Sequence, residues 1–223
     1  SKTFTITAQS GYRISDVLVD GESIGAVGEY TFEKVRKDHS IQVTFVKDVA
    51  DPTNTGVSGW LNTGDHVAFM TGYANGLFGT EDHVTRAQVA QMFYRLLRDQ
   101  DVTITKTFRD VPGSAWYAKA VNTLASLGMV SGVGEGRFEP DRAITRAEFT
   151  AIAAKFAKAS LVGELSFVDV PAGAWYRESV LTAVVYGWIA GVGNGRFEPG
   201  RAITRAEAAA IVNRMLARSA DQN

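Results

Sequence analysis

Three arginines occupy positions where they could bind a charged ligand. Arg146 and Arg205 lie in identical Thr-Arg-Ala-Glu segments, and Arg86 lies in a related Thr-Arg-Ala-Gln segment. If each segment begins a helix, the arginine takes the first helical position, where a cation is disfavoured by the helix dipole. A residue placed against local preference in every copy is a candidate for function.

These arginines could capture a carboxylate. A guanidinium binds a carboxylate through two parallel hydrogen bonds. The free amides at a helix N-terminus also form an anion site. Together the two features would hold a ligand that carries a carboxylate. A salt bridge between neighbouring repeats is the alternative explanation for the arginines.

Aromatic residues and glycines could complete such a site. Trp116 and Trp175 are each followed by a tyrosine and could offer flat apolar faces to a sugar ring, although aromatic residues at helical spacing more often belong to a core. Glycines in the loops between the helices let the backbone turn tightly or approach a ligand closely. These are Gly134, Gly136, Gly193 and Gly195. No β-strand or βαβ unit surrounds these loops, so they do not form a dinucleotide fingerprint.

The sequence offers little for catalysis or metal binding. It contains no cysteine, which excludes disulfides, thiolate metal sites and cysteine nucleophiles. No GxSxG, HExxH, P-loop or EF-hand motif occurs. The histidines are scattered without the spacing of metal ligands: His39, His66 and His83. Acidic residues near the loops are interpreted as turn formers: Asp110, Asp141 and Asp169. We expect no catalytic site, metal or cofactor here, any catalytic region lying outside this sequence.

The arginines and tryptophans belong to an internal repeat. Residues 132–148 recur almost unchanged at 191–207, and a weaker copy occupies 72–88. A Phe-x-Asp-Val-Pro motif and a Trp-Tyr pair precede the segments at 132–148 and 191–207 at the same spacing. A fixed period of about 59 residues predicts a repeat architecture, in which the copies pack on one another to make a core.

Each repeat is expected to fold as helix, loop and helix. In the second repeat, Trp116, Val121 and Leu124 keep helical spacing, and Gly128 is a C-terminal cap. The second helix of each repeat would begin with a capping box, in which threonine and Glu or Gln satisfy each other's amides. The predicted cap residues are Thr85, Thr145, Thr204, Gln88, Glu148 and Glu207. The first repeat lacks the Trp-Tyr pair, and its first helix is predicted to be shortened to near Asp65–Met70.

The first 47 residues show the alternation of β-strands instead. Asp20-Gly21 is a hairpin-turn signal directly after an apolar run. Four strands are expected, near 3–8, 13–19, 29–35 and 40–46. A module of this size has a thin core.

The composition limits the partners. A content of 45% hydrophobic residues is ordinary for a globular protein with a core. Because the net charge is -1, bulk electrostatic capture of nucleic acid has little support. No apolar run is long enough for a membrane span, so we expect no membrane insertion. No signal peptide opens the sequence, and a strand-like pattern begins at once, so we expect a piece of a longer protein.

These patterns predict six segments. They are a small all-β module at 1–47, a linker at 48–59, a shortened first repeat at 60–100, a second repeat at 101–160, a third at 161–218 and a tail at 219–223.

The repeats resemble a triplet of S-layer homology domains. The motifs that carry the resemblance are FxDVP, the Trp-Tyr pair, the GxGxGxFxP loop and ITRAE, and they cover about residues 60–218. The β module resembles the InlB-B-repeat-like units found beside anchoring modules in bacterial surface proteins. The resemblance implies a mainly α fold, with three helix-loop-helix repeats in a pseudo-three-fold spindle, plus the small all-β N-terminal module.

The resemblance also implies a function. The domain triplet would bind secondary cell wall polysaccharide attached to peptidoglycan, in grooves between repeats, often through pyruvylated N-acetylmannosamine. It would thereby anchor a secreted protein non-covalently at the cell wall or S-layer, on the extracellular face of a Gram-positive-type envelope. Carried onto this chain, the ligand would meet Arg86, Arg146 and Arg205, with Trp116, Trp175 and the loop glycines near the sugar.

Three expectations remain open from the sequence. The grooves that use Arg146 and Arg205 are favoured, because the first repeat departs most from the pattern. Replacing these arginines by alanine is expected to weaken binding and leave folding nearly intact. The β module is expected to be a spacer, with binding of carbohydrate or protein as the other interpretation. The alternative function of the chain is protein–protein association or self-assembly within an S-layer, through the grooves or the β module.

Overall fold

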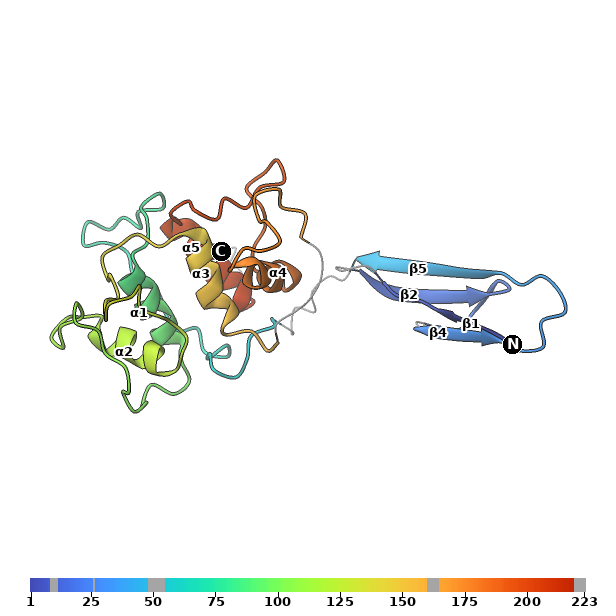
Figure 1. The fold of residues 1–223 in the computed structure, drawn as a ribbon, viewed down its shortest axis with the longest axis horizontal. Helices are drawn as coiled ribbons and strands as arrows, with labels where there is room; N and C mark the ends of the chain where they lie inside the picture. The colour runs from blue at the N-terminus through green and yellow to red at the C-terminus, as the bar shows by residue number, and fades with distance from the viewer. Residues whose placement is uncertain (9–11, 26, 48–54, 160–164, 219–223) are drawn as a thin grey trace. The chain divides into compact units, whose positions relative to one another are not determined.

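The computed structural model describes residues 1–8, 12–25, 27–47, 55–159 and 165–218. The chain divides into two compact units, Ser1–Pro52 and Thr53–Asn223 (Figure 1). The first unit is built from strands and the second from helices and loops, so the prediction of a mainly α chain with a small β module is confirmed. Most of the predicted linker and the tail at 219–223 lie outside the described residues.

The β unit contains two antiparallel sheets. In one sheet β1 pairs with β4, and in the other β2 lies between β3 and β5. Asp20 and Gly21 connect β2 to β3 with φ angles of 53° and 88°, which confirms the predicted turn. The strands are β1 (Lys2–Thr5), β2 (Tyr12–Val19), β3 (Glu22–Ser23), β4 (Glu29–Phe32) and β5 (Ile41–Lys47).

The core of the β unit is thin, as expected from its size. Among the described residues, Val17, Val19 and Phe32 are its buried apolar side chains. Each of the four predicted strands is present, although β1 and β4 end earlier than predicted. Strand β3 was not predicted, because its two residues are too few to show an alternating pattern.

The second helix of each repeat begins at its capping box. These helices are α1 (Arg86–Leu96), α3 (Arg146–Ala154) and α5 (Arg205–Met215). At each start the threonine oxygen accepts a hydrogen bond from the third helical amide, and the Glu or Gln side chain accepts one from the threonine amide. This reciprocal pair holds the first turn in place and fixes where the helix begins.

The first helices, present in the second and third repeats, are α2 (Ala118–Ser126) and α4 (Arg177–Val185). Both begin after the Trp-Tyr pair without a side-chain cap, and a left-handed glycine follows each of them, Gly128 at φ 75° and Gly187 at φ 72°. Their apolar faces pack against the core, where Val121, Leu124 and Val180 have no exposed surface. The tyrosine of each pair is half-buried against the same core.

The prediction of a short helix near Asp65–Met70 is wrong, because described residues 61–81 contain none. Asn62 accepts hydrogen bonds from the amides of Gly64 and Asp65, which fixes a turn there. Arg218 donates to the carbonyls of Asp65 and Val67, so these groups are satisfied without a helix. A six-residue segment also gains too few helical hydrogen bonds to offset nucleation.

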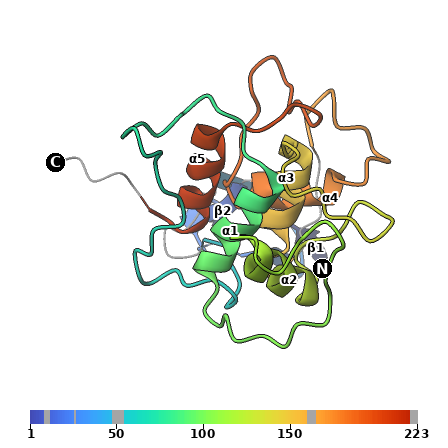
Figure 2. The same ribbon diagram turned by 90° about the vertical axis from the view of Figure 1, so that its left-hand side faces the viewer.

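The three repeats contact one another in a closed cycle. The amide of Val84 donates to the carbonyl of Ile203 (3.1 Å), Ile203 to Ile144 (3.0 Å), and Ile144 back to Val84 (2.9 Å). All three residues are fully buried, and each directly precedes a capping threonine. Figure 2 shows α1, α3 and α5 in the middle of the helical unit, with long loops outside them. The three capping boxes therefore directly follow residues that meet at one buried centre.

Candidate functional site

Three grooves with corresponding linings occur in the described part of the helical unit. Each takes a motif arginine from one repeat and both a loop and a helix from the next, and two of them add a tryptophan from the repeat after that. We number the grooves by the repeat that supplies the helix. Because the repeats contact one another in a cycle, each groove lies at a junction between copies.

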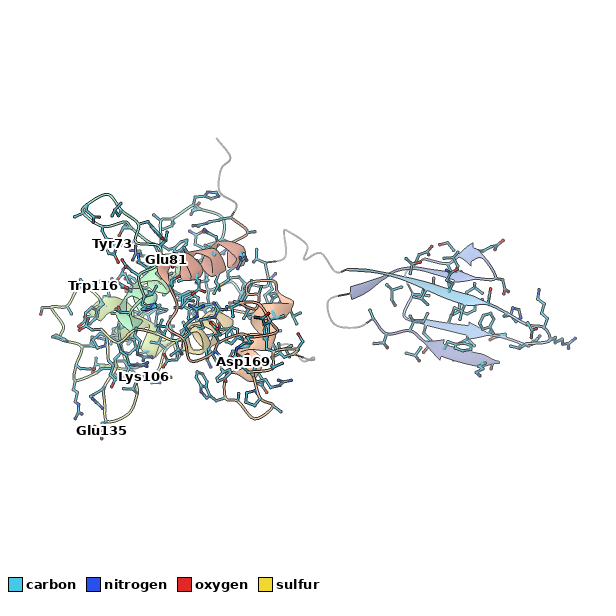
Figure 3. The ribbon with its side chains drawn as sticks, turned by 90° about the horizontal axis from the view of Figure 1, so that it is seen from above. Tyr73, Glu81, Lys106, Trp116, Glu135 and Asp169 are labelled. Carbon is cyan, nitrogen blue, oxygen red and sulfur yellow. The ribbon has the colours of Figure 1, made fainter. Side chains whose placement is uncertain are left out.

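Groove 1 is built on α1. Arg205 enters it from the third repeat and Trp116 from the second, and Figure 3 shows Trp116 and Tyr73 on the same side of the helical unit. Its lining is Phe69, Met70, Thr71, Gly72, Tyr73, Gln88, Gln91, Met92, Arg95, Trp116 and Arg205.

Groove 2 is built on α3. Arg86 enters it from the first repeat and Trp175 from the third. Its lining is Arg86, Met129, Val130, Ser131, Gly132, Val133, Glu148, Ala151, Ile152, Lys155 and Trp175.

Groove 3 is built on α5. Arg146 enters it from the second repeat, but among the described residues no aromatic side chain lines it. The first repeat, which would supply that side chain, lacks the Trp-Tyr pair. The lining is Arg146, Ile189, Ala190, Gly191, Val192, Glu207, Ala210, Ile211 and Arg214.

The motif arginines are buried at the backs of these grooves, with 5–7% of each residue exposed. Arg205 donates from Nε to the carbonyl of Phe78 (2.8 Å) and from Nη2 to that of Thr71 (2.7 Å). Arg86 and Arg146 make the equivalent pairs of bonds to the carbonyls of the next repeat. Each guanidinium therefore ties its repeat to the following one through backbone carbonyls.

Each guanidinium also lies over an aromatic ring. The guanidinium carbon of Arg86 is 4.5 Å from the ring centre of Phe138, and that of Arg146 is 5.0 Å from Phe197. Arg205 lies 4.7 Å from Tyr73 and 4.8 Å from Phe78. Such contacts stabilise a cation that has lost much of its water.

The alternative explanation of the arginines, an ion pair between repeats, applies to them unequally. Nη1 of Arg146 is 3.1 Å from Oε1 of Glu207, in the third repeat. Nη1 of Arg86 is 4.0 Å from Oε1 of Glu148. Among the described residues, Arg205 has no ion-pair partner within 4.0 Å. Burial lowers the pKa of Arg86 and of Arg146, and the neighbouring glutamate partly offsets that change.

The first three amides of the helices are not available to a ligand. The amides of Arg86 and Ala87 donate to carbonyls of the second repeat at 3.0 and 2.9 Å, and that of Gln88 donates to Thr85. The corresponding amides of α3 and α5 are bonded in the same way. The hypothesis that these helix N-termini form anion sites is therefore wrong for this chain.

The glutamates of the capping boxes have a second partner. Arg142 donates two hydrogen bonds to Glu148, at 2.6 and 3.2 Å, and Arg201 does the same to Glu207. Burial raises the pKa of Glu148, but the hydrogen bonds from Arg142 and the Thr145 amide outweigh it, so the net pKa is lowered. The balance at Glu207 is the same.

The tryptophans of the Trp-Tyr pairs are among the most exposed apolar residues. Trp116 is 63% exposed and Trp175 is 69% exposed, and each packs edge-on against its tyrosine. They are therefore not core residues, and each presents an indole ring at a groove.

The four predicted loop glycines lie outside the groove linings. They have left-handed φ angles of 66–108° and form tight turns, in which Arg137 donates to the carbonyl of Gly134. The glycines within the grooves are Gly72, Gly132 and Gly191. A Cβ on Gly132 would lie 2.6 Å from the carbonyl oxygen of Arg137 and 2.7 Å from the ring of Phe108.

The aspartate of each FxDVP motif ties the loop that precedes the second helix to the segment that precedes the first helix. Asp110 accepts hydrogen bonds from the amides of Phe138 and Glu139 at 2.8 and 2.7 Å, and Asp169 holds the equivalent amides. Burial raises the pKa of Asp110, but these amides outweigh it and the net pKa is lowered. The sequence predicts turn formers at these positions, whereas the carboxylates bind amides 28 and 29 positions further along the chain.

Two groups of groove residues were missed in the sequence. The first is a basic residue at the end of the helix: Arg95 and Arg214 lie in the last turn, and Lys155 directly follows α3. Each follows its motif arginine by nine positions in every repeat, which is a signal that the sequence contains. The second is the residue before the groove glycine, Thr71 or Ser131, which is Ala190 in groove 3.

Neither a cluster of metal ligands nor a membrane-spanning helix occurs among the described residues. No group of three or more His, Cys, Asp or Glu in them could hold a metal ion. None of the helices there has the length and hydrophobicity needed to cross a membrane.

Comparison with known proteins identifies the repeats. The family model for the S-layer homology domain matches residues 68–90, 107–150 and 166–209, one stretch in each repeat. The chain is 35% identical over 168 residues to a cellulosome-anchoring protein of Acetivibrio thermocellus, covering 70% of this chain and 37% of that protein. It is 36% identical over 143 residues to an amylopullulanase of Thermoanaerobacterium thermosulfurigenes, covering 61% of this chain and 8% of that protein.

A third relative is the S-layer protein sap of Bacillus anthracis, 36% identical over 109 residues, which are 48% of this chain and 13% of that protein. The chain thus spans little more than a third of the first relative and far less of the others. The predicted localisation, a secreted protein at the cell wall or S-layer on the extracellular face, is confirmed by these matches. The resemblance of residues 1–47 to InlB-B-type repeats stays a prediction. The chain carries a triplet of S-layer homology domains, the domain that anchors proteins at the bacterial cell surface.

Proposed function

We propose that this chain anchors its protein to the cell wall non-covalently, by binding an anionic secondary polysaccharide in the grooves between repeats. The observation that carries the proposal is the shared groove chemistry. Each groove has a buried guanidinium at its back and a second cation on its helix, and two grooves add an exposed indole.

This chemistry suits an acidic sugar. The apolar face of a pyranose ring would pack on the indole of Trp116 or Trp175, and a carboxylate would be attracted by the two cations. The buried guanidinium already bonds two carbonyls, so it would act mainly through its charge and its remaining N–H groups. The cation nearer the surface, Arg95 or Lys155, is the better candidate for direct contact.

The ligand that meets these requirements, and that the family resemblance implies, is pyruvylated N-acetylmannosamine in a polymer attached to peptidoglycan. Its pyruvate ketal supplies the carboxylate. We also infer that the three repeats form a pseudo-three-fold spindle. The cyclic hydrogen bonds and the corresponding groove linings support that arrangement.

The test is co-sedimentation with purified sacculi, before and after hydrofluoric acid removes the secondary polymer. The exposed tryptophans are suitable positions for mutation, because their loss should not disturb the core. We expect the double variant Trp116→Ala/Trp175→Ala to sediment with intact sacculi no better than with stripped ones. Trp60→Ala is the matched control, since Trp60 is 48% exposed and lines none of the three grooves.

The remaining outcomes separate the alternatives. Full binding to stripped sacculi would mean that peptidoglycan itself is the partner. Absence of binding to either preparation, together with concentration-dependent oligomers, would favour self-assembly within an S-layer. We propose no catalysis by this chain.

A further inference from the structure

We propose that the three grooves differ in anion-binding strength, with groove 1 the strongest, groove 2 intermediate and groove 3 without ligand. This inference rests on the proposed function and specifies which junctions perform it. The evidence is a comparison of corresponding lining positions, because each groove has the same set of positions occupied by different residues.

The first difference is the neutralisation of the motif guanidinium. In groove 3 the carboxylate of Glu207 lies 3.1 Å from Arg146, and in groove 2 that of Glu148 lies 4.0 Å from Arg86. Groove 1 has Gln88 at this position. A guanidinium with a carboxylate beside it attracts a further anion less than one without, because the carboxylate, although shared with Arg142 or Arg201, offsets part of its field.

Gln88 also changes the hydrogen bonding that groove 1 offers. Its Oε1 accepts from the Thr85 amide at 2.9 Å, so its Nε2 points elsewhere and has no partner among the residues that the structure describes. An amide nitrogen donates, whereas an ionised glutamate can only accept. Groove 1 therefore offers a donor to a ligand oxygen where the other grooves present a carboxylate.

The acidic neighbour of groove 1 is already engaged. Asp82 occupies the position that Arg142 and Arg201 hold in the other repeats, and it bonds the hydroxyl of Tyr73, whose pKa it raises. Its carboxylate is absent from the groove lining and is not within ion-pair distance of Arg205 among the described contacts. Asp82 therefore reduces the potential of groove 1 without blocking the guanidinium.

Groove 3 has lost three further features. No indole lines its described part, and Ala190 replaces the hydroxyl residue Thr71 or Ser131. Its helix cation is also engaged, because Nη1 of Arg214 donates to the carbonyl of Trp188 at 3.2 Å. By contrast, the side chains of Arg95 and Lys155 make no hydrogen bond or ion pair with a described residue. Groove 3 is therefore a structural joint between the second and third repeats.

The test is a titration of the full chain with a methyl glycoside of pyruvylated N-acetylmannosamine, followed by NMR. The indole N–H signals of Trp116 and Trp175 report on grooves 1 and 2, and the amide of Val192 reports on groove 3. We expect Trp116 to saturate first, Trp175 at higher concentration, and Val192 to stay unshifted. Trp60 serves as the reference signal outside the grooves.

The decisive variant is Gln88→Glu, which gives the first repeat the residue of the other two. A glutamate completes the same capping box, so the melting temperature should not fall. We expect affinity at Trp116 to drop about tenfold, equivalent to about 1.4 kcal/mol, with the Trp175 curve unchanged. Glu148→Gln is the converse, and should tighten binding at Trp175 alone.

The outcomes distinguish this inference from the proposed function. Equal saturation at all three reporters, or an unchanged Trp116 curve in Gln88→Glu, would overturn the ranking while leaving the anchoring proposal intact. A wild-type chain that shifts no reporter, and does not sediment with intact sacculi, would overturn both.

Discussion

Replacing Arg205 by alanine should destabilise the helical unit, even though the sequence placed this residue in a ligand site. The side chain donates two short hydrogen bonds to carbonyls of the first repeat, more than a hundred positions earlier in the chain. Its guanidinium also lies over two aromatic rings. The variant loses all four contacts at once.

The magnitude can be estimated from these contacts. A hydrogen bond from a charged group contributes roughly 1.5–3 kcal/mol. Because the freed carbonyl of Thr71 borders a groove that water can enter, we expect a net loss of about 2–4 kcal/mol rather than the full sum. For a unit of this size, 1 kcal/mol shifts the melting temperature by about 2–4 °C, so the decrease should be roughly 5–15 °C.

The assay is thermal unfolding of the full chain, followed by circular dichroism at the helical band. Arg196→Ala is the matched control, since it removes the same charge from a side chain that is 54% exposed. Arg205→Lys should recover only part of the loss, because an ammonium cannot serve both carbonyls in a planar fork. If Arg205→Ala melts within about 2 °C of the wild type, the carbonyl contacts contribute little and the reasoning fails.

Three other changes have expected outcomes. Glu148→Ala removes a helix cap and an arginine pair and should cost about 1–2 kcal/mol in denaturant unfolding, more than Gln88→Ala, which removes only a cap; equal losses would show that the pair adds nothing. Stability should fall as the pH is lowered from about 4, because carboxylates such as Asp110 have a lower pKa in the folded chain than in the unfolded one. The unfolded chain therefore takes up protons first as the pH falls. This contribution to stability is complete above the unfolded pKa and is lost as the pH falls through the folded pKa. A denaturation midpoint that is the same at pH 7 and pH 3 would refute this. Gly132→Ala should cost about 1–3 kcal/mol, since its Cβ would meet a carbonyl and an aromatic ring, whereas Gly113→Ala, with open space around it, should unfold like the wild type.

The local features were predictable from the sequence. The capping boxes are an example, because both partners of Thr145 and Glu148 lie within one turn. The hairpin at Asp20 and the glycines that end α2 and α4 are equally local. The exact repeat made the mainly helical architecture predictable as well, since an element found in one copy recurs in the next.

The role of the arginines was not predictable in the same way. Their partners are carbonyls at least 44 residues away in sequence, and a carbonyl leaves no mark in the sequence because every residue has one. The sequence therefore suggested a free guanidinium at a free helix end, whereas both groups are occupied by the neighbouring repeat. The short helix near Asp65 failed for a related reason, since Arg218 satisfies its carbonyls from the far end of the chain.

The groove cations leave a signal in the sequence. Arg95, Lys155 and Arg214 share one spacing from the motif arginine, a pattern that helix stability does not require. A systematic comparison of equivalent positions across the three copies would have found them. It would also have found that Gln88 and Ala190 break the pattern at two grooves.

The cycle of hydrogen bonds among Val84, Ile144 and Ile203 bears on how the chain is made. An open array of repeats can gain stability copy by copy as each one is synthesised. A closed ring gains its last contacts only when the third copy has been synthesised, because the buried amide of Val84 bonds the carbonyl of Ile203, 119 positions later. Stability should therefore appear in one step near the end of synthesis, and a chain shortened or lengthened by one copy should leave unpaired groups at the centre. The number of repeats is thus set by the geometry of the centre and is not freely adjustable during evolution.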